Sequence, residues 1–341
     1  MKFDFIIGNP PYQDNVENKG DRPNPIYDKF MDEAYSLADV VELITPGRFL
    51  FNAGQTAKEW NKKMLGDTHL KVLEYYPKSS DVFVNADIKG GVAITLHNTN
   101  EYFGEIGSFT AFSELNNIVS KVKKKHDVFL NNIVSSQGIY HFSKKAYNDF
   151  PVIKSFAGKG TGSKIVSAIV EKLPDLFLDK KPQSGCYIEI IGRSPSGRFS
   201  KYILREYIEE VCYTDAYKVL IPEANGSGAI GEVLSTPLIG EPLIGVTDTF
   251  LCVGCFDNKK ETEALFKYIK TKFARCMLGV NKVTQHNPKS TWKDVPVQDF
   301  TANSDIDWSK SIPEIDQQLY AKYGLDEEEI TFIESHVKEM M

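Results

Sequence analysis

The amino-acid sequence predicts an α/β protein in which an open, partly parallel sheet is followed by a mixed α+β region. Two observations carry this prediction. Apolar strand-like runs alternate with amphipathic helical patterns up to about residue 97, and beyond residue 100 the chain breaks into short strands, turns and many glycines. With 341 residues, of which 42% are apolar and 25% charged, the chain is long enough for two or three domains with cores of their own.

The first part contains four strand-like runs and two helical patterns. The runs lie at residues 3–7, 39–46, 71–77 and 90–98, and the helical patterns at residues 24–38 and 56–65. The run from Phe3 to Ile7 is interrupted only by Asp4 and ends at Gly8, which is typical of a strand buried on both faces of a parallel sheet. Four strands make only part of an open α/β sheet.

The second part is less regular and ends in an acidic segment. Core spacing predicts one long helix over residues 259–278, and two short amphipathic helices follow near the end of the chain. The first of these ends at Gly324, and the second begins at Asp326, where Glu329 completes a capping-box pattern. A basic run at residues 121–125 is interpreted as a solvated helix face. We expect domains at residues 1–110, 111–301 and 302–341, the last being an acidic helical tail.

Charge and cysteine content limit the function classes. The net charge is -6, but residues 302–341 alone contribute -7, so the rest of the chain is near neutral and a nucleic-acid partner is neither required nor excluded. Five cysteines at irregular spacing suit a reducing compartment. Cys252 and Cys255 lie in an apolar run and are interpreted as core thiols, with a metal or redox pair as the lesser alternative. Without a secretion leader or a run of about 20 apolar residues, we expect a cytoplasmic protein and no membrane partner.

The motif Asn9-Pro10-Pro11-Tyr12, directly after the first strand, carries the chemistry. The exocyclic amine of adenine or cytosine is a poor nucleophile because its lone pair is delocalised into the ring. Two acceptors, one for each N–H, can localise that lone pair, and the side-chain oxygen of Asn9 and the carbonyl of Pro10 are suitable. Prolines lack N–H groups, so this carbonyl stays free at the end of a strand, where ligands bind in open α/β sheets. Tyr12 offers an aromatic face to a base turned out of its duplex.

This stretch resembles the catalytic motif of amino-group DNA methyltransferases that use S-adenosylmethionine. DVFVNADIKGGVAITL resembles a later element of that family, in which a phenylalanine, here Phe83, lies against the flipped base. YKVLIPEANGSG, WKDVPVQDFT and SDIDWSKSIPEIDQQLYAKYGL look like the specificity region and tail of large bacterial restriction–modification methylases. The resemblance implies a partial Rossmann-like methyltransferase sheet, a DNA-recognition domain, adenine N6 as the target atom and double-stranded DNA as the partner. The motif also occurs in enzymes that methylate RNA or protein glutamine.

The resemblance also gives candidate site residues. Asn9, Pro10, Pro11, Tyr12 and Phe83 are the catalytic candidates, and Gly8 with Asn9 would lie against the cofactor. Basic and amide side chains near motif-like runs are candidates for DNA contact, with surface solvation as the alternative for each: Arg193, Arg198, Lys201, Lys218, Lys282 and Gln285. No metal site is expected, and no nuclease-type cluster is evident.

The cofactor-binding strand and glycine-rich turn of the family normally precede the catalytic motif, and here only two residues precede the first strand. We therefore expect the C-terminal part of such an enzyme, inactive alone, with a separate chain as one source of the other half. Residues 150–179 imitate a nucleotide-binding β-turn-α, with glycines at 158, 160 and 162, but Pro151 and Lys154 interrupt the presumed strand, and a loop is preferred. The alternative function is a catalytically silent, sequence-specific DNA-binding module. Methylation of RNA or protein is a third.

Overall fold

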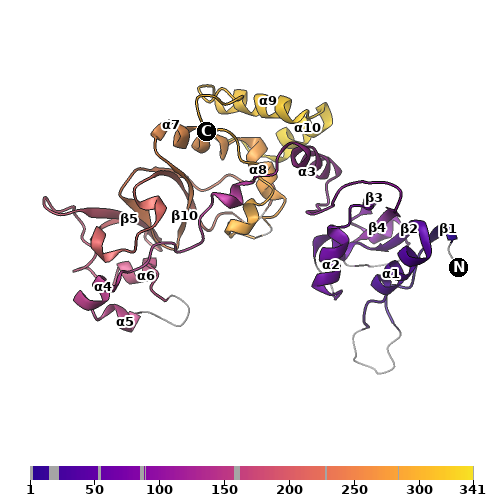
Figure 1. The fold of residues 1–341 in the computed structure, drawn as a ribbon, viewed down its shortest axis with the longest axis horizontal. Helices are drawn as coiled ribbons and strands as arrows, with labels where there is room; N and C mark the ends of the chain where they lie inside the picture. The colour runs from indigo at the N-terminus through magenta and orange to yellow at the C-terminus, as the bar shows by residue number, and fades with distance from the viewer. Residues whose placement is uncertain are drawn as a thin grey trace. The chain divides into compact units, whose positions relative to one another are not determined.

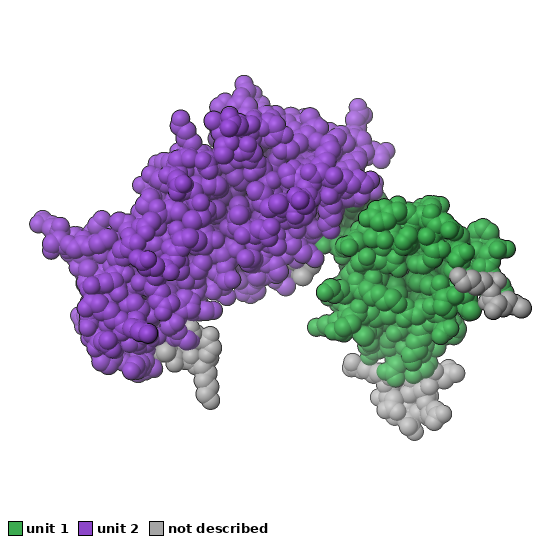
Figure 2. Space-filling view, viewed as in Figure 1, with its two compact units in different colours: residues 1–116 green, residues 117–341 purple. Residues whose placement is uncertain are grey.

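The computed structural model describes residues 3–14, 23–52, 55–84, 88, 90–156, 162–226, 229–282 and 284–340. The chain divides into two compact units, residues 1–116 and 117–341, which Figure 2 colours separately. Strands and helices occur in both, so the expectation of a mixed α/β protein is confirmed.

Unit 1 contains one four-stranded sheet in the order β1-β2-β4-β3. Its strands are β1 (Phe3–Gly8), β2 (Ala38–Pro46), β3 (Leu70–Tyr76) and β4 (Val92–Asn98). β1 is parallel to β2, and β4 is antiparallel to both of its neighbours, so β1, β2 and β3 all run in the same direction. All four strands lie where the alternating apolar runs predict them.

Two helices cover one face of this sheet, α1 (Tyr27–Leu37) and α2 (Lys58–Leu65), as Figure 1 shows. Their apolar residues Met31 and Met64 are fully buried together with Leu43 of β2 and Ala93 of β4. Ile6 of β1 packs against the same cluster, because alternate residues of a strand point to opposite faces.

The other face of β1 differs from the prediction of a strand buried on both faces. Phe3, Phe5 and Ile7 are 49%, 69% and 78% exposed. The reason is position in the sheet: β1 is an edge strand, and α1 and α2 pack on the side of Ile6. Composition alone cannot separate an apolar strand with two covered faces from an apolar edge strand with one.

Unit 2 contains two three-stranded sheets with helices around them. One sheet has the order β10-β7-β8 and is antiparallel; the other has the order β6-β5-β9, in which β5 pairs antiparallel with β6 and parallel with β9. The strands are β5 (Tyr187–Ser194), β6 (Gly197–Leu204), β7 (Tyr217–Pro222), β8 (Leu238–Gly240), β9 (Ile244–Val246) and β10 (Phe250–Phe256).

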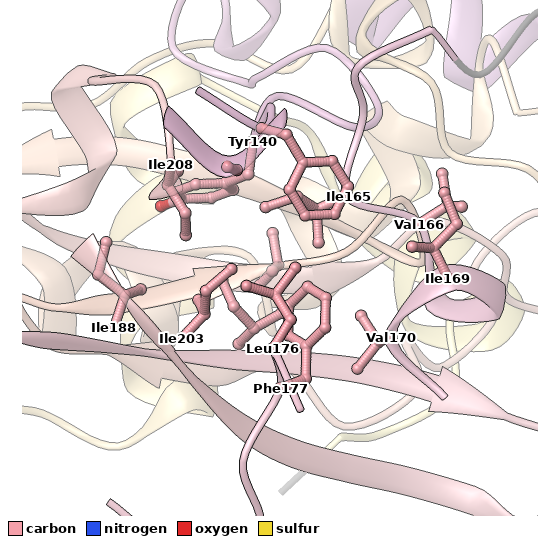
Figure 3. Close-up of a cluster of buried hydrophobic side chains, with 14 of the residues drawn as sticks. Tyr140, Ile165, Val166, Ile169, Val170, Leu176, Phe177, Ile188, Ile203 and Ile208 are labelled. Carbon is pink, nitrogen blue, oxygen red and sulfur yellow. The ribbon is translucent and has the colours of Figure 1, made fainter. Parts of the chain in front are cut away.

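A single apolar cluster joins these two sheets. Figure 3 shows Tyr140, Ile188 and Ile203 pointing toward one another, with Leu176 and Phe177 beside them. The same cluster includes residues of β7, β9 and β10 and of the short helices α4 (Lys144–Asp149), α5 (Ile153–Phe156) and α6 (Ser167–Val170). The core therefore fixes the β5–β6 hairpin to the rest of unit 2.

The remaining helices are α3 (Ser113–Lys125), α7 (Lys259–Tyr268), α8 (Lys272–Gly279), α9 (Ile312–Tyr323) and α10 (Glu327–His336). The prediction of one helix over residues 259–278 is wrong, because Thr271 caps a new helix by accepting a hydrogen bond from the N–H of Ala274. The two tail helices have the predicted caps: Gly324 is left-handed, with φ 64°, and Asp326 forms a capping box with Glu329.

The basic run on α3 is only partly solvated. The Lys121 ammonium lies 2.6 Å from Glu329 and 3.1 Å from Asp326, and the Lys125 ammonium donates to the carbonyl of Lys322 at 2.6 Å. The acidic tail therefore packs within unit 2, and lysines of α3 neutralise part of its charge.

One further expectation is corrected, for Cys255, and the nucleotide-binding alternative at residues 150–179 lacks its strand among the described residues. Cys252 is buried, but Cys255 is exposed, because a bulge between Val253 and Phe256 with Gly254 at φ 73° breaks the alternation of β10. Ile153–Phe156 is helical where a nucleotide-binding unit would need a strand, and glycines 158 and 160 lie outside the described residues. Within the described ranges no metal-ligand cluster occurs, and no helix combines the length and apolarity needed to span a bilayer.

Candidate functional site

The carboxyl ends of three strands of unit 1 lie side by side along the same end of its sheet, and this line of strand ends is called the edge below. β1 ends at Gly8, β2 at Pro46 and β3 at Tyr76, and Val92 at the start of β4 pairs with both Pro46 and Tyr76. This edge is the position at which open α/β sheets bind ligands. The Asn9-Pro10-Pro11-Tyr12 motif follows β1 there, as the sequence predicts.

Asn9 and Pro10 present unused acceptors. The side chain of Asn9 is exposed, and Pro10 is half-buried. Neither the Asn9 amide nor the Pro10 carbonyl hydrogen-bonds to another described residue. Pro10 and Pro11 have no N–H with which to join a ladder, so the chain leaves the sheet here. Both acceptors remain available to the two N–H groups of an amine.

Tyr12 is held by its backbone and by its ring. Its carbonyl accepts a hydrogen bond from Ile26 at 3.2 Å, and Asp14 and Asn24 pair at 3.0 Å, so residues 12–14 and 24–26 form a short ladder leading into α1. The ring packs against the apolar cluster under the sheet, and burial raises the pKa of the phenol to about 12. Tyr12 is therefore neutral at physiological pH and is no proton acceptor.

The Tyr12 hydroxyl is buried, and within the described part of the chain it has no hydrogen-bond partner. A buried polar group without a partner costs about 1–3 kcal/mol and calls for an explanation. The described residues therefore leave this hydroxyl as a further unpaired polar group at the strand end.

A cavity of about 130 Å³ adjoins Tyr12. Its described lining comes from the segment after β1, the start of α1, the end of β2 with the segment after it, and the β3–β4 loop, through Tyr12, Gln13, Pro25, Tyr27, Pro46, Arg48, Gln55 and Ile88. Among the described residues that line the cavity, Arg48 alone is charged. Asn9, Pro10 and Phe83 are not part of it. The structure therefore brings Tyr12 to the cavity and leaves Asn9 and Pro10 on the neighbouring surface.

Phe83 lies in the β3–β4 loop and is half-buried. Its N–H donates to the carbonyl of Ser79 at 2.8 Å, and the Ser79 hydroxyl accepts from the N–H of Ile88 at 2.9 Å. Because Ile88 lines the cavity, the loop that carries Phe83 reaches the same edge as Tyr12. Residues 85–87 and 89 lie outside the described residues.

Sequence reasoning missed several residues at this end of the sheet: Arg48, Tyr27 and the glycine pair Gly90-Gly91. Gly91 has φ 68°, and a Cβ there would collide with the carbonyl of Tyr76. Gly90 has φ 84° and packs against the Arg48 side chain. Only glycine fits both conditions. The sequence signal that could have identified Arg48 is its position, because Gly47-Arg48 directly follows a buried strand that ends at Pro46.

The DNA-contact candidates in unit 2 are separated by the fold. Lys218 is fully buried, and its ammonium donates to the carbonyls of Ala216 and Glu241 at 3.1 and 2.8 Å. Lys282 is 4% exposed and bonds to the carbonyl of Asn225 at 2.7 Å. Neither ammonium reaches the surface, so neither lysine can contact DNA in this fold.

The other candidates are at the surface. Lys201 forms an ion pair with Asp179. Gln285 is exposed, and its carbonyl accepts from Asn225 at 2.6 Å. Arg193 and Arg198 lie opposite each other on the β5–β6 hairpin. The structure therefore brings together this pair of arginines and none of the other candidates.

The described residues do not by themselves fit whole S-adenosylmethionine. Cavities that hold drug-sized ligands measure roughly 300–1,000 Å³, whereas the cavity beside Tyr12 measures about 130 Å³. Gly8 and Asn9 lie at the open edge of β1, where Phe5 and Ile7 are exposed. The described residues of this site offer acceptors for an amine and an aromatic wall, but they do not enclose a place for the methyl donor.

The segment that carries this site is similar to proteins of a known family. Residues 1–83 match the model of the Eco57I restriction-modification methylase family. An "uncharacterized adenine-specific methylase" of Mycoplasma pneumoniae is 27% identical over 152 residues, which cover 44% of this chain and 36% of that protein. These matches confirm the resemblance to adenine-specific methylases of restriction–modification systems that the sequence suggests.

Two solved structures are also similar. The type IIG restriction endonuclease BpuSI is 11% identical with a TM-score of 0.32, over 92% of this chain and 48% of that one. The type IIL restriction-modification enzyme MmeI, in complex with DNA, is 9% identical with a TM-score of 0.33, over 98% of this chain and 56% of that one. The chain thus spans about half the length of these two proteins.

Proposed function

We propose that this chain carries the target-base side of a DNA adenine-N6 methyltransferase of a restriction–modification system. The observation that carries the proposal is a pair of acceptors, on Asn9 and Pro10, that no described residue hydrogen-bonds, at the carboxyl end of β1 beside Tyr12. The family match over residues 1–83 includes this motif and supports the choice of adenine.

Asn9 and Pro10 act on the target amine by hydrogen bonding. The side-chain oxygen of Asn9 accepts one N–H of adenine N6, and the carbonyl of Pro10 accepts the other. Two acceptors out of the ring plane draw the nitrogen toward a tetrahedral shape, so its lone pair becomes available for methylation. Because no described carboxylate or imidazole is part of the motif, its contribution is positioning and polarisation of the amine.

Tyr12 and Phe83 hold the base. An adenine within a duplex cannot reach a strand edge, so the target nucleotide has to leave the stack. The Tyr12 ring is fixed by the ladder of residues 12–14 and 24–26, and Phe83 lies on the loop whose Ile88 lines the adjacent cavity. Aromatic stacking on either side then compensates for the lost base stacking.

The methyl donor implied by the family is S-adenosylmethionine, with Gly8 and Asn9 as the residues nearest to it. The order β1-β2-β4-β3, with β4 antiparallel, supports the interpretation of unit 1 as one part of a Rossmann-like methyltransferase sheet. The exposed apolar side chains of β1 support a further layer on that side, from the same polypeptide or from a separate chain. Residues 1–341 alone therefore bind the donor feebly and turn over slowly.

The test is transfer of labelled methyl groups to genomic DNA, which contains every short recognition sequence. It is run with the chain alone and with an added cofactor-binding half from an Eco57I-family methylase. Asn9→Ala is expected to lower the rate about 10²–10³-fold, as loss of a preorganised polar contact to the reacting group does. Asn100→Ala, an exposed asparagine in the turn after β4, is the matched control and should leave the rate unchanged. Undiminished transfer by Asn9→Ala would refute the assignment.

A catalytically silent DNA-binding module is the second candidate, favoured by the lack of an enclosed donor pocket among the described residues. It predicts DNA binding that is indifferent to Asn9→Ala, together with no methyl transfer under any complementation. Calorimetry with S-adenosylmethionine and the chain alone gives an independent check, because a micromolar site would contradict both the silent module and the proposed incompleteness.

A further inference from the structure

The β5–β6 hairpin presents two arginines side by side. β5 and β6 pair antiparallel around the turn Pro195-Ser196, with Arg193 directly opposite Arg198. Directly opposed residues of an antiparallel pair point to the same face, with their Cβ atoms about 4.5–5.5 Å apart. Two guanidinium groups are therefore forced onto one small area.

Both guanidinium groups are held in place by neutral contacts. They lie over the ring of Phe250, at 5.9 Å for Arg193 and 5.6 Å for Arg198, and that ring is 1% exposed. One nitrogen of Arg198 donates to the carbonyl of Thr236 at 3.2 Å, and the backbone N–H of Arg193 donates to the Thr249 hydroxyl at 3.0 Å. The Arg198 guanidinium is thus positioned by the Phe250 ring and the Thr236 carbonyl, and the Arg193 guanidinium by the Phe250 ring, before any ligand arrives.

No carboxylate neutralises this pair within the described residues. Two neighbouring cations do have acidic partners: Lys201 of β6 pairs with Asp179, and Arg205, which directly follows β6, makes a two-pronged contact with Asp215 at 2.6 and 2.5 Å. Glu189 accepts instead from the Ser200 hydroxyl at 2.5 Å. Like charges directly opposite each other destabilise a sheet, and burial, together with the charge of Arg193, lowers the pKa of Arg198.

We propose that Arg193 and Arg198 together bind one backbone phosphate of duplex DNA. A phosphate relieves the repulsion between the two guanidinium groups, and its oxygens match their planar donors. Ser194, at the end of β5, and Ser196, in the turn, lie at the same tip; their hydroxyls hydrogen-bond to each other at 2.7 Å, which leaves one O–H donor for a phosphate oxygen.

A polymer phosphate suits this place better than a free anion. Arg198 and the turn residues are exposed, so the site is a projecting tip without the enclosure that small ligands need. The identity of the polymer as DNA rests on the proposed function; the anion site itself rests on the arginine pair.

The test measures the affinity of the full chain for labelled duplexes of several sequences by fluorescence anisotropy across a salt series. Arg198→Gln should weaken binding severalfold for all sequences alike and should reduce the slope of log affinity against log salt by about 1. Arg193→Gln should do the same, and the double variant should lose little more than either single variant, because both side chains serve one phosphate. Arg205→Gln, whose guanidinium is already paired, is the matched control and should keep the wild-type slope.

Several outcomes would overturn the proposal. These are unchanged binding by both single variants, additive losses in the double variant, a loss confined to one DNA sequence, or no duplex binding by the wild-type chain. Competition by inorganic phosphate beyond that of chloride at equal ionic strength would indicate a free-anion site instead. Thermal unfolding of each variant separates a binding defect from misfolding. Asn9→Ala retains this DNA affinity, so a failed phosphate site and a failed methylation site are distinguishable.

Discussion

Unit 2 contains two groups of cations that the sequence cannot tell apart and the fold treats in opposite ways. Lys218, Lys282 and Arg275 are buried, and backbone carbonyls surround them; the Arg275 guanidinium alone donates to four, those of Lys270, Gly231, Glu232 and Lys338. Arg193 and Arg198 lie on a hairpin with a buried ring beneath them and no acidic partner among the described residues.

The difference shows which cations are structural and which are free to bind. A buried cation is tolerable only when its hydrogen-bonding capacity is used, and its removal leaves carbonyls without donors. A surface cation that the fold orients but does not neutralise adds little to stability, and it retains its charge for a ligand. The two groups should therefore separate cleanly when stability and DNA affinity are measured on the same variants.

The largest stability effect is expected for Lys282→Ala. The Lys282 ammonium contacts the carbonyl of Asn225 at 2.7 Å and the Glu232 carboxylate at 3.2 Å. Without it the Asn225 carbonyl loses its donor and the half-buried carboxylate loses this partner, at a cost on the order of 3 kcal/mol of unfolding free energy. Urea unfolding followed by tryptophan fluorescence reports the change, because Trp292 and Trp308 lie in unit 2.

Lys124→Ala is the control for this prediction. Lys124 is an exposed lysine of α3 without an ion pair among the described residues, and its replacement should change stability by no more than about 0.5 kcal/mol. Equal effects of the two substitutions would mean that the buried ammonium is not structural, and the contrast between the two groups of cations would be lost.

A smaller effect, and a pH-dependent one, is expected from Lys218. Burial lowers the pKa of Lys218 from 10.5 to about 8. Between these values the unfolded chain binds the proton and the folded chain releases it, so the contribution of Lys218 to stability rises as pH increases from about 8 to 10.5. A neutral amine still has two N–H donors for the carbonyls of Ala216 and Glu241.

The measurement compares wild type with Lys218→Met, because the raised pKa values of buried tyrosines and cysteines act in the opposite direction over part of this range. Wild-type stability relative to Lys218→Met should increase by on the order of 1–3 kcal/mol between pH 7.5 and 10.5. A constant difference across these pH values would show that Lys218 titrates in the folded protein as it does in water.

The sequence predicts features that depend on neighbouring residues and misses those that depend on contacts between distant segments. Local signals were sufficient for the four strands of unit 1, the placement of Asn9 after β1, and the caps at Gly324 and Asp326, because each depends on neighbouring residues. The exposure of Ile7 and of Cys255 was missed, because an edge position and a bulge arise from pairing with distant strands.

The cations were missed for a related reason. In the sequence, Lys218 looks like any surface lysine beside a recognition motif, although it lies in an apolar strand. Only folding brings the Glu241 carbonyl to its ammonium. The cavity beside Tyr12 likewise draws on segments after β1, after β2 and before β4. Strand-end position predicted the first of these segments, whereas the segment after β2 was not selected, and the Gly90-Gly91 turn that packs against Arg48 depends on contacts between residues far apart in the sequence.

The smallest stability effect is expected for Arg198→Gln at the β5–β6 hairpin. This variant best separates cations that bind DNA from cations that stabilise the fold. The substitution loses a contact with the Phe250 ring and one hydrogen bond to Thr236, each worth about 0.5–1 kcal/mol at an exposed site, and it removes the repulsion from Arg193. These contributions oppose one another, so the unfolding free energy should change by less than about 0.5 kcal/mol while DNA affinity falls severalfold. Urea unfolding and anisotropy on one preparation measure both quantities. If Arg198→Gln destabilises unit 2 as much as Lys282→Ala does, Arg198 holds the hairpin in place, and a fall in DNA affinity would then follow from lost structure.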